Sequence, residues 1–554
     1  MHYSLTNHSR LARRDLLKLG AGVALGSFTA PQLFAADGNA SPGAINGEPY
    51  AERVGQRVLE DGGNAVDAII AAALTAAITS PEQTGIGGYG MHAVIALDGG
   101  KRIVAIDGNG PSPAAMTSDL FKPGPTGLVP ERDRKTGWMR SPGWRSVGVP
   151  GLLGGLQLTL DKFGTRKFGE LVQPAIKYAR DGFDWPEKLT GVLKAIPQLR
   201  QDPGSQKLYF RSGQPIQPGE RFKNPELADL LTALAQANSV EAFYRGDIAQ
   251  RIAEGFAKNG GLVTAQDLAS YHPRVVEPST ATWGEHKFYT APPTAGGFTV
   301  VQMLCTLRAL NWDKLPDDLT RKQLQIEAMR LAWRDRLTLL GDSDFSKVPL
   351  ERLLSDDYAL ESAERIQAAV KAGTILDHKV VPTGQTETIN LSGADRDGNF
   401  VALTLTHGDN FGSCMTVDGL GLTLGAGVCR FDPRPDHPNG PGPGKRPLNN
   451  MCPTVVTRAG KPILAAGGAG GRLIPNSLFE VLTQFVVLGK PLAEAIAAQR
   501  LHTEGDATVL FEGDLPAATT SSLRKAGYVI GTGGRKAKIS AVAREGDGLQ
   551  HGRR

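Results

Sequence analysis

The stretch Glu387–Thr406, ETINLSGADRDGNFVALTLT, carries the pattern that decides the fold. Apolar or small residues alternate with polar ones from Ile389 to Gly393, and the run FVALTLT follows the pair Asp397-Gly398. Alternation with a period of two predicts a half-buried strand, and Asp-Gly between two such runs predicts a tight hairpin turn. We therefore expect two antiparallel strands, with Thr388 at the start of the first.

Thr388 at the start of a core strand also has a chemical interpretation. A threonine hydroxyl is a weak nucleophile unless a base lies beside it. If the chain is cut before Thr388, the new α-amino group, with an ordinary pKa of about 7.7–8.0, can be that base. The same residue then supplies nucleophile and proton acceptor. The alternative is that Thr388 is an ordinary strand residue of a hairpin.

Other catalytic and cofactor-binding motifs are not supported. GIGGYG (85–90) has dinucleotide-type glycine spacing, but it follows a predicted helix and opens a strand, the reverse of the nucleotide-binding context. GPGPGKR (440–446) lacks the Ser or Thr that must follow the lysine of a phosphate-binding loop. The sequence contains no G-x-S-x-G and no H-E-x-x-H motif. We therefore expect no metal and no cofactor.

The composition is typical of a loop-rich globular enzyme. The chain has 554 residues, 41% of them hydrophobic, with 68 glycines and 36 prolines in no repeat. Of the formal net charge of +5, the first 36 residues contribute +3, from four cationic residues and one acidic residue. The remaining excess is small and forms no basic run, which argues against a nucleic-acid partner.

The N-terminal segment resembles a bacterial twin-arginine (Tat) export signal. Arg13 and Arg14 precede a moderately apolar run, 16–28, and a small-residue cleavage site lies near Ala35 or Ala36. Residues 1–36 are therefore predicted to be a signal peptide that directs the protein to the periplasm. The alternatives are a Sec signal or an anchored helix, but the run is too short and too rich in glycine for a stable membrane span.

The four cysteines leave two possibilities open. Cys429 and Cys452 bracket a loop rich in proline and glycine (432–447), and a disulfide between them would close it. An exported protein permits such a bond. The favoured alternative is that Cys305, Cys414, Cys429 and Cys452 are all buried thiols.

The segment TINLSGADRDGN (388–399) resembles the nucleophile motif T-x-x-[FY]-S-x-x-D-x-D-G-N of the γ-glutamyltranspeptidases. Further motifs of this family occur in order along nearly the whole chain after residue 36: GGNAVDA (62–68), GVPG (148–151), PAIKYARDGF (174–183), FYRGDIA (243–249), PPTAGGF (292–298), KRPLNNMCPT (445–454) and GGAGG (467–471). The resemblance implies the α+β class, as the four-layer αββα sandwich of the N-terminal nucleophile hydrolases. It also implies that one precursor cleaves itself between Glu387 and Thr388, giving a heterodimer of a large subunit, 37–387, and a small subunit, 388–554.

The resemblance also implies roles for single residues. Thr388 matches the nucleophile, and Thr406 matches a second threonine that hydrogen-bonds it. Gly470 and Gly471 match a glycine pair whose backbone N–H groups form an oxyanion hole. The alternatives are a solvent-facing strand residue for Thr406 and a tight turn for the glycine pair.

The chain departs from the family pattern where the family binds the glutamyl group. Asn109 replaces the arginine that holds the α-carboxylate, Arg430 replaces the aspartate that holds the α-ammonium, and Asn449 and Asn450 replace a serine pair. An arginine repels an ammonium and attracts a carboxylate. We therefore expect a small-molecule amide whose acyl group carries a carboxylate, bound by Arg430 while Asn109 offers neutral hydrogen bonds.

Three alternatives stay open at this stage. In the first, Arg430 points to solvent and contacts no substrate. In the second, the enzyme is a glutathione hydrolase or γ-glutamyltransferase that binds glutamate through other residues. In the third, the protein is a non-catalytic periplasmic binding protein on the same fold.

Overall fold

The computed structural model describes residues 32–35, 42–118, 143–316, 318–377, 387–432, 434, 436–533 and 536–554. Most of the predicted signal peptide, residues 1–36, lies outside these ranges, and so do residues 378–386 before the expected cleavage point. Within these ranges, no helix is both long and apolar enough to cross a lipid bilayer.

The predicted hairpin lies at the centre of the first sheet. Its strands, β12 and β13, pair antiparallel, and Gly398 in the turn between them has a φ of +82°, a conformation that favours glycine. Asp395 accepts hydrogen bonds from the Asp397 and Asn399 backbone N–H groups, which fixes the turn. In spatial order the strands are β2 (Gly43–Asn46), β12 (Glu387–Asp395), β13 (Phe400–Gly408), β3 (Gly90–Leu97), β4 (Arg102–Asp107) and β9 (Arg274–Val276).

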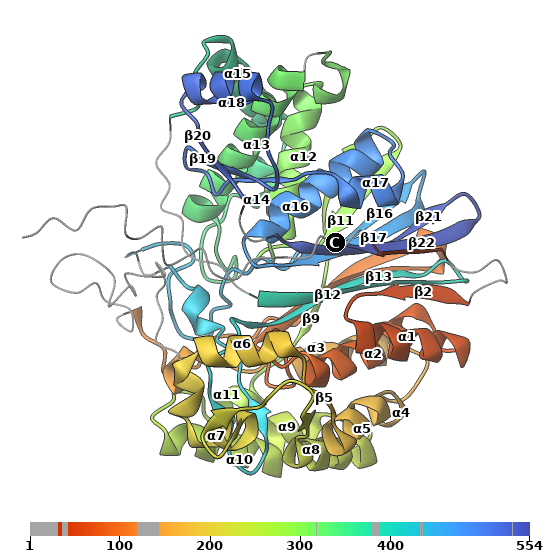
Figure 1. Cartoon of the computed structure of the whole chain (residues 1–554), viewed down its shortest axis with the longest axis vertical. Helices are drawn as coiled ribbons and strands as arrows, with labels where there is room; N and C mark the ends of the chain where they lie inside the picture. Colours follow the sequence, from red (N-terminus) through yellow and green to blue (C-terminus); the bar gives the residue numbers. More distant parts are fainter. Residues whose placement is uncertain are drawn as a thin grey trace, which may run out of the picture.

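A second sheet lies face to face with the first (Figure 1). In spatial order its strands are β1 (Gln32–Ala35), β22 (Gly548–Arg553), β21 (Lys538–Glu545), β17 (Lys461–Ala469), β16 (Thr454–Arg458), β11 (His286–Thr290) and β10 (Ser279–Trp283). Strand β1 falls within the expected signal peptide and pairs only along the β22 edge. Loss of residues 1–36 would therefore leave the rest of this sheet intact.

Helices cover the outer face of each sheet (Figure 1). Those on the side of the first sheet are α1 (Pro49–Glu60), α2 (Ala65–Thr79), α3 (Leu152–Phe163), α4 (Phe168–Leu171), α5 (Gln173–Asp181), α6 (Glu187–Ala195), α7 (Pro203–Tyr209), α8 (Pro225–Ala237), α9 (Glu241–Arg245), α10 (Asp247–Lys258) and α11 (Ala265–Ala269). Those on the side of the second are α12 (Gly297–Ala309), α13 (Asp318–Leu339), α14 (Leu350–Leu353), α15 (Asp356–Lys371), α16 (Leu473–Leu482), α17 (Leu492–Ala497) and α18 (Ala517–Ala526). The expected four-layer αββα sandwich is confirmed.

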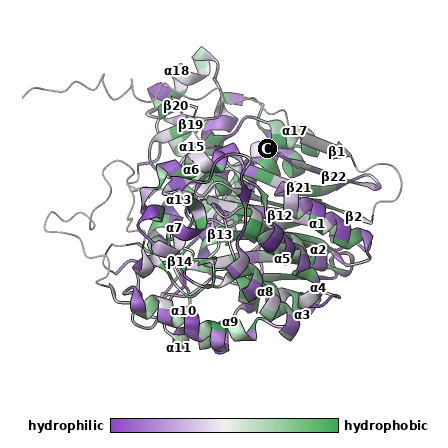
Figure 2. Ribbon diagram, turned by 60° about the horizontal axis from the view of Figure 1, so that its bottom comes forward, coloured by the Kyte–Doolittle hydropathy of each residue, from purple (hydrophilic) through white to green (hydrophobic). Residues whose placement is uncertain are grey.

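Short peripheral strands complete the described structure. They form four small sheets: β5 (Phe183–Asp184) with β8 (Arg221–Phe222), β6 (Phe210–Arg211) with β7 (Gln214–Pro215), β14 (Thr416–Val417) with β15 (Leu422–Thr423), and β18 (Leu501–His502) with β19 (Thr508–Phe511) and β20 (Val529–Thr532). Figure 2 shows hydrophilic and hydrophobic residues mixed along outer helices such as α10, whose buried residues include Ile252 and Phe256. This is the pattern of helices that bury one face.

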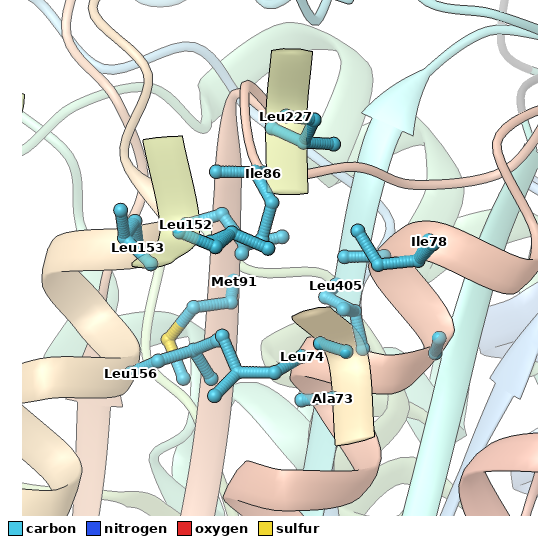
Figure 3. Packing of buried hydrophobic residues seen from close by; sticks show 14 of the residues in the cluster. Ala73, Leu74, Ile78, Ile86, Met91, Leu152, Leu153, Leu156, Leu227 and Leu405 are labelled. Atoms are coloured by element: carbon cyan, nitrogen blue, oxygen red, sulfur yellow. The ribbon is translucent and has the colours of Figure 1, made fainter. Parts of the chain in front are cut away.

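The alternation of apolar and polar residues in the sequence determines which side chains of β12 and β13 lie on each face of the first sheet. Ile389, Leu391 and Leu405 belong to the large core beneath the first sheet, where Leu405 packs with Leu74 and Ile78 of α2 (Figure 3). Helix α2 is buried along its whole length. It begins with a capping box, because Asn64 accepts from the Asp67 N–H and the Asp67 carboxylate accepts from the Asn64 N–H.

The opposite faces of these strands contact the second sheet through small or hydrogen-bonded side chains. Asn390 of β12 donates to Ser540 Oγ of β21 at 2.8 Å and accepts from Thr404 Oγ1 of β13, also at 2.8 Å. Gly467 of β17 faces the same amide, and a Cβ atom on this glycine would lie 2.1 Å from Asn390 Oδ1. The close approach of the two sheets at this point therefore requires glycine at 467.

We predict that Gly467→Ala destabilises the protein by about 1–3 kcal/mol, because the added methyl group has no space between the sheets. The free energy of unfolding from denaturant titration measures this. Gly191→Ala is the matched control, since Gly191 lies within α6 and a Cβ there meets no atom within 4 Å. The control should be neutral or more stable by about 0.5–1 kcal/mol. Equal stability of the two variants would contradict the proposed sheet contact.

Candidate active site

Thr388 and Thr406 face the second sheet from neighbouring strands. Across the strand pair, Glu387 lies opposite Gly408 and Ile389 opposite Leu405, so Thr388 faces Thr406 and His407 at a β-bulge. Thr388 lies two residues from Asn390 on β12, and Thr406 lies two residues from Thr404 on β13, so each points to the same face as its neighbour. Asn390 and Thr404 both face the second sheet. Thr388 and Thr406 are 3% and 2% exposed. The solvent-facing alternative for Thr406 is therefore wrong.

Contacts between the sheets show which end of the second sheet Thr388 approaches. The Arg544 guanidinium lies over the ring of Phe400, which pairs with Ala394 of β12. Asn390, four residues before Ala394 on β12, contacts Ser540 of β21. Ser540 in turn lies four residues before Arg544. Ser540 pairs with Gly467 and Lys538 with Ala469, the residue before Gly470. Thr388 lies two residues before Asn390 on β12. It therefore lies towards the end of the sheets where β17 runs into Gly470 and Gly471.

Gly470 and Gly471 form the turn from β17 into α16. Their φ values are +133° and +62°, and a Cβ on Gly470 would lie 2.8 Å from the Ala537 Cα, so the turn favours glycine. Helix α16 has no side-chain hydrogen bond at its N-cap. The first backbone N–H groups of a helix lack intrahelical partners and attract negative charge. The glycine pair is thus a tight turn, as one alternative held, and it also opens a helix N-terminus beside the Thr388 end of the sheets.

Tyr89, which no sequence motif singled out, lies beside the end of β13 that carries Thr406. Thr406 Oγ1 accepts a hydrogen bond from the Gly408 N–H at 2.8 Å, and Gly408 packs against the Tyr89 ring. Burial raises the pKa of Tyr89 to about 12, while the nearby Arg430 and Arg336 cations act in the opposite direction and Asp409 reinforces the rise. Tyr89 therefore remains a neutral phenol between two arginines and a carboxylate.

Arg430 is buried and already has a partner. Its side chain is 7% exposed, and its Nη2 lies 3.2 Å from the Asp409 carboxylate, which is equally buried. The alternative in which Arg430 points to solvent is therefore wrong. The sequence analysis also treated Arg430 as an unopposed cation, which is incomplete, because Asp409 at the end of β13 balances its charge.

Asn109 is fully buried, and its side-chain NH2 group donates its hydrogen bonds to other protein atoms. Its Nδ2 donates to Thr294 Oγ1 at 2.7 Å and to the Pro447 carbonyl at 2.8 Å, while its buried Oδ1 has no hydrogen-bond partner. Asn109 can thus offer a ligand an acceptor, in place of the cation that the family has at this position.

Asn449 and Asn450 meet an arginine that the sequence analysis missed. Arg336 of α13 donates through Nη2 to the Asn449 carbonyl at 2.5 Å and to Asn450 Oδ1 at 3.2 Å. Asn449 in turn donates its backbone N–H to the Thr294 carbonyl, and its Nδ2 lies 3.0 Å from His92 Nε2. Thr294 therefore links Asn449 to Asn109, and the predicted replacements at 109, 449 and 450 lie in one cluster.

Arg336 and Arg472 connect the residues at 449 and 450 with the glycine turn. The guanidinium groups of Arg336 and Arg472 both lie over the Trp333 ring, at 5.8 and 5.4 Å from its centroid. Arg472 directly follows Gly471. Arg336 also acts on Tyr89, so it connects the residues at 449 and 450 with the glycine turn and with the residues beside β13.

The four cysteines are free thiols in the structure. Cys305, Cys414 and Cys452 are buried, and Cys429 is partly exposed. This agrees with the favoured alternative rather than with a Cys429–Cys452 disulfide, except that Cys429 is less buried than expected. Burial raises the pKa of Cys452 to about 12, so this thiol stays protonated.

No motif signalled Tyr89, Asp409 or Arg336 as site residues. Tyr89 lies within GIGGYG, which drew attention only as an apparent nucleotide motif, and Asp409 lies just past the second hairpin strand. Arg336 lies in a helix rich in charged residues, where an arginine is unremarkable in sequence. The useful signal for Arg336 is its burial, which only the structure provides.

Comparison with known proteins identifies the family. The family model for γ-glutamyltranspeptidase matches residues 51–553. The chain is 33% identical to the glutathione hydrolase proenzyme of Escherichia coli (strain K12), over 82% of this chain and 79% of the other. It is 29% identical to the acylase ACY 1 proenzyme of Pseudomonas sp. (strain SE83), over 92% and 90% of the two chains.

A solved structure agrees with this assignment. The cephalosporin acylase from Bacillus halodurans superposes with a TM-score of 0.82 at 26% identity, covering 94% of each chain. The family and these relatives establish that the chain is an enzyme of the amide-hydrolase and acyl-transfer class. With the αββα sandwich and nearly the whole chain matched, this protein belongs to the γ-glutamyltranspeptidase family of N-terminal nucleophile hydrolases.

Proposed function

We propose that this protein is a self-cleaving N-terminal threonine amidohydrolase whose acyl substrate carries a carboxylate. The observation that carries the proposal is the convergence of Thr388, Thr406 and the Gly470–Gly471 turn at one end of the facing sheets. The proenzyme names of its relatives support processing of one precursor into two subunits. Export to the periplasm is part of the proposal and rests only on the twin-arginine pattern within residues 1–36.

Processing would use the same hydroxyl as catalysis. Thr388 Oγ1 attacks the Glu387 carbonyl carbon, the peptide C–N bond breaks, and the Glu387 acyl group moves to oxygen as an ester. Water then hydrolyses the ester, releasing a Glu387 carboxylate and a free Thr388 α-amino group. That amine, with an ordinary pKa of about 7.7–8.0, is a base within the nucleophilic residue itself.

Turnover would then follow the acyl-enzyme route. The α-amino group takes the Thr388 hydroxyl proton as Oγ1 attacks the substrate amide, and the developing oxyanion is stabilised by N–H groups of the Gly470–Gly471 turn. The proton passes to the leaving amine, and water hydrolyses the acyl ester. Because Thr406 Oγ1 already accepts from the Gly408 N–H, its own proton can be donated towards Thr388 across the bulge.

The charge of the site supports the proposal that the acyl group of the substrate carries a carboxylate. Tyr89 lies near the cations Arg430 and Arg336 and the single carboxylate of Asp409. The region thus has an excess of positive charge, which favours an anionic group and disfavours an ammonium. A dicarboxylic mono-amide such as a glutaryl amide meets this requirement.

A second candidate is hydrolysis of glutathione or transfer of a γ-glutamyl group. Relatives named glutathione hydrolase proenzyme favour it, since they share about a third of their residues with this chain. The two candidates differ in whether the site accepts an α-ammonium group. The Arg430–Asp409 ion pair favours the first, because the Asp409 carboxylate is already engaged.

We predict that the purified protein separates on a denaturing gel into two pieces, the smaller being residues 388–554. Thr388→Ala should remain a single chain because it lacks the attacking hydroxyl, and Thr388→Ser should still cleave because it keeps one. N-terminal sequencing of the small piece should begin at Thr388. An uncut wild-type chain that hydrolyses its substrate would overturn the mechanism.

Substrate preference is the direct test of the proposed acyl group. We expect kcat/KM for glutaryl-4-nitroanilide to exceed that for γ-glutamyl-4-nitroanilide by at least about 10-fold, the equivalent of about 1.4 kcal/mol from an unopposed ammonium in a region of net positive charge. Release of 4-nitroaniline, with and without glycylglycine as acceptor, measures both hydrolysis and transfer. The opposite preference would establish the second candidate instead.

A separate prediction concerns the Arg430–Asp409 pair. Arg430→Ala removes a buried cation and leaves the Asp409 carboxylate to interact with a substrate ammonium, so the preference should move towards the γ-glutamyl compound by roughly 10-fold or more. The double variant Arg430→Ala with Asp409→Asn is the matched control and should lose this gain. If Arg430→Ala leaves the ratio of the two kcat/KM values unchanged, the pair has no part in specificity.

A further inference from the structure

In the described part of the chain, the buried arginines have carboxylate partners, with one exception. Arg330 pairs with Glu327 at 2.7 Å, Arg472 with Glu504 at 2.6 Å, and Arg500 with Glu512 at 3.0 Å. Arg336 is equally buried, at 2% exposure, but no ion pair joins it to a carboxylate in the described part of the chain. A buried charge without a counter-charge is unfavourable, and such groups in proteins are commonly paired or functional.

The hydrogen bonds of Arg336 are also incomplete. Of its two terminal nitrogens, Nη2 donates to the Asn449 carbonyl and Asn450 Oδ1, while Nη1 is buried and has no hydrogen-bond partner among the described residues. A guanidinium normally engages a carboxylate through two parallel N–H groups. Arg336 thus has a donor nitrogen without a partner, on a side chain whose other nitrogen fixes the Asn449–Asn450 segment.

The position of Arg336 relates it to the candidate active site. Asn449 and Asn450 replace the serine pair of the family's carboxylate site, and Arg336 contacts both. Asn109 replaces the arginine of that site, but its Nδ2 is used by Thr294 and Pro447, which leaves only an acceptor atom. A carboxylate needs donors. Arg336 Nη1 is a cationic donor of this cluster that has no hydrogen-bond partner among the described residues.

We infer that Arg336 binds the carboxylate of the acyl substrate, with Nη1 as the donor and Asn450 beside it. The inference rests on the proposed function and specifies which residue selects the acyl group. Arg430 is less suited to this role because Asp409 already neutralises it. Specificity for the acyl group would thus come from α13, in the large subunit, while the nucleophile comes from the small one.

The protonation state of Arg336 agrees with this role. Burial lowers the pKa of Arg336 to about 10, and the Arg472 cation acts in the same direction, while Cys452 and Tyr89 oppose it. The guanidinium therefore stays charged at neutral pH, without a counter-ion of its own. An anionic ligand would supply the missing charge, whereas a neutral ligand of the same shape would not.

The test compares two substrates that differ only in that charge. Glutaryl-4-nitroanilide carries a carboxylate, and 4-carbamoylbutyryl-4-nitroanilide carries a neutral amide in its place. We expect Arg336→Met to lower kcat/KM for the glutaryl compound by about 10- to 100-fold more than kcat/KM for the carbamoyl compound. Arg334→Met, two residues away on α13 and facing Asp335, is the matched control and should leave the ratio at its wild-type value.

Self-cleavage and the melting temperature separate binding from folding. If Arg336→Met is cleaved and folded and its substrate ratio equals that of wild type, the inference is overturned. If Arg336→Met fails to fold, Arg336→Lys keeps the cation but loses the planar pair of donors. It should lower turnover of the glutaryl compound more than that of the carbamoyl compound, and an equal loss on both substrates would assign Arg336 a purely structural role.

The result also distinguishes this inference from the proposed function. If the wild-type enzyme prefers γ-glutamyl-4-nitroanilide, the proposed acyl class is wrong. The γ-glutamyl group has a carboxylate as well, so Arg336→Met should still lower its turnover by about 10-fold or more if Arg336 binds carboxylates. Competitive inhibition by glutarate, but not by glutaramide, should be present in wild type and lost in Arg336→Met. Equal inhibition of the two proteins by glutarate would overturn the inference whichever substrate is preferred.

Discussion

The close contact between the two sheets at Asn390 and Gly467 is the constraint on which the site depends. The Asn390 amide accepts from Thr404 and donates to Ser392 and Ser540, so a polar group between two sheets is satisfied on both sides. These bonds fix how the sheets are aligned. A shift of β12 by one residue would turn its inward side chains towards the helices. The alignment therefore determines whether Thr388 reaches the glycine turn at the end of β17.

The site combines two kinds of buried charge, and they have different consequences. The Arg430–Asp409 pair is internally neutral, and in the proposed function it would act by excluding an ammonium group. Arg336 is charged without a carboxylate in the described structure, so it gains most from a ligand that brings one. In the proposed function, exclusion of the amine and attraction of the acid would thus come from separate side chains.

The parts of the fold that depend on neighbouring residues were predictable from sequence. The hairpin at Asp397-Gly398 rests on residues within a few positions of one another, and the structure confirms it. The contacts within the site join distant segments: Asn109 meets Thr294, 185 residues away, and Arg336 meets Asn449, 113 residues away. No local pattern specifies such contacts. The resemblance to the family located the replaced positions but not the partners that now occupy them.

The position of the Glu387–Thr388 bond explains how a cut chain would keep its site. The bond lies at the start of β12, and β12 and β13 are held between β2 and β3, which precede the bond in sequence. In the second sheet, β16 likewise pairs with β11 from the earlier part of the chain. Each piece thus supplies strands to both sheets, and neither has a closed core of its own. Cleavage would remove one covalent link and create an amine on the inter-sheet face, where the surrounding strands already fix the position of the threonine.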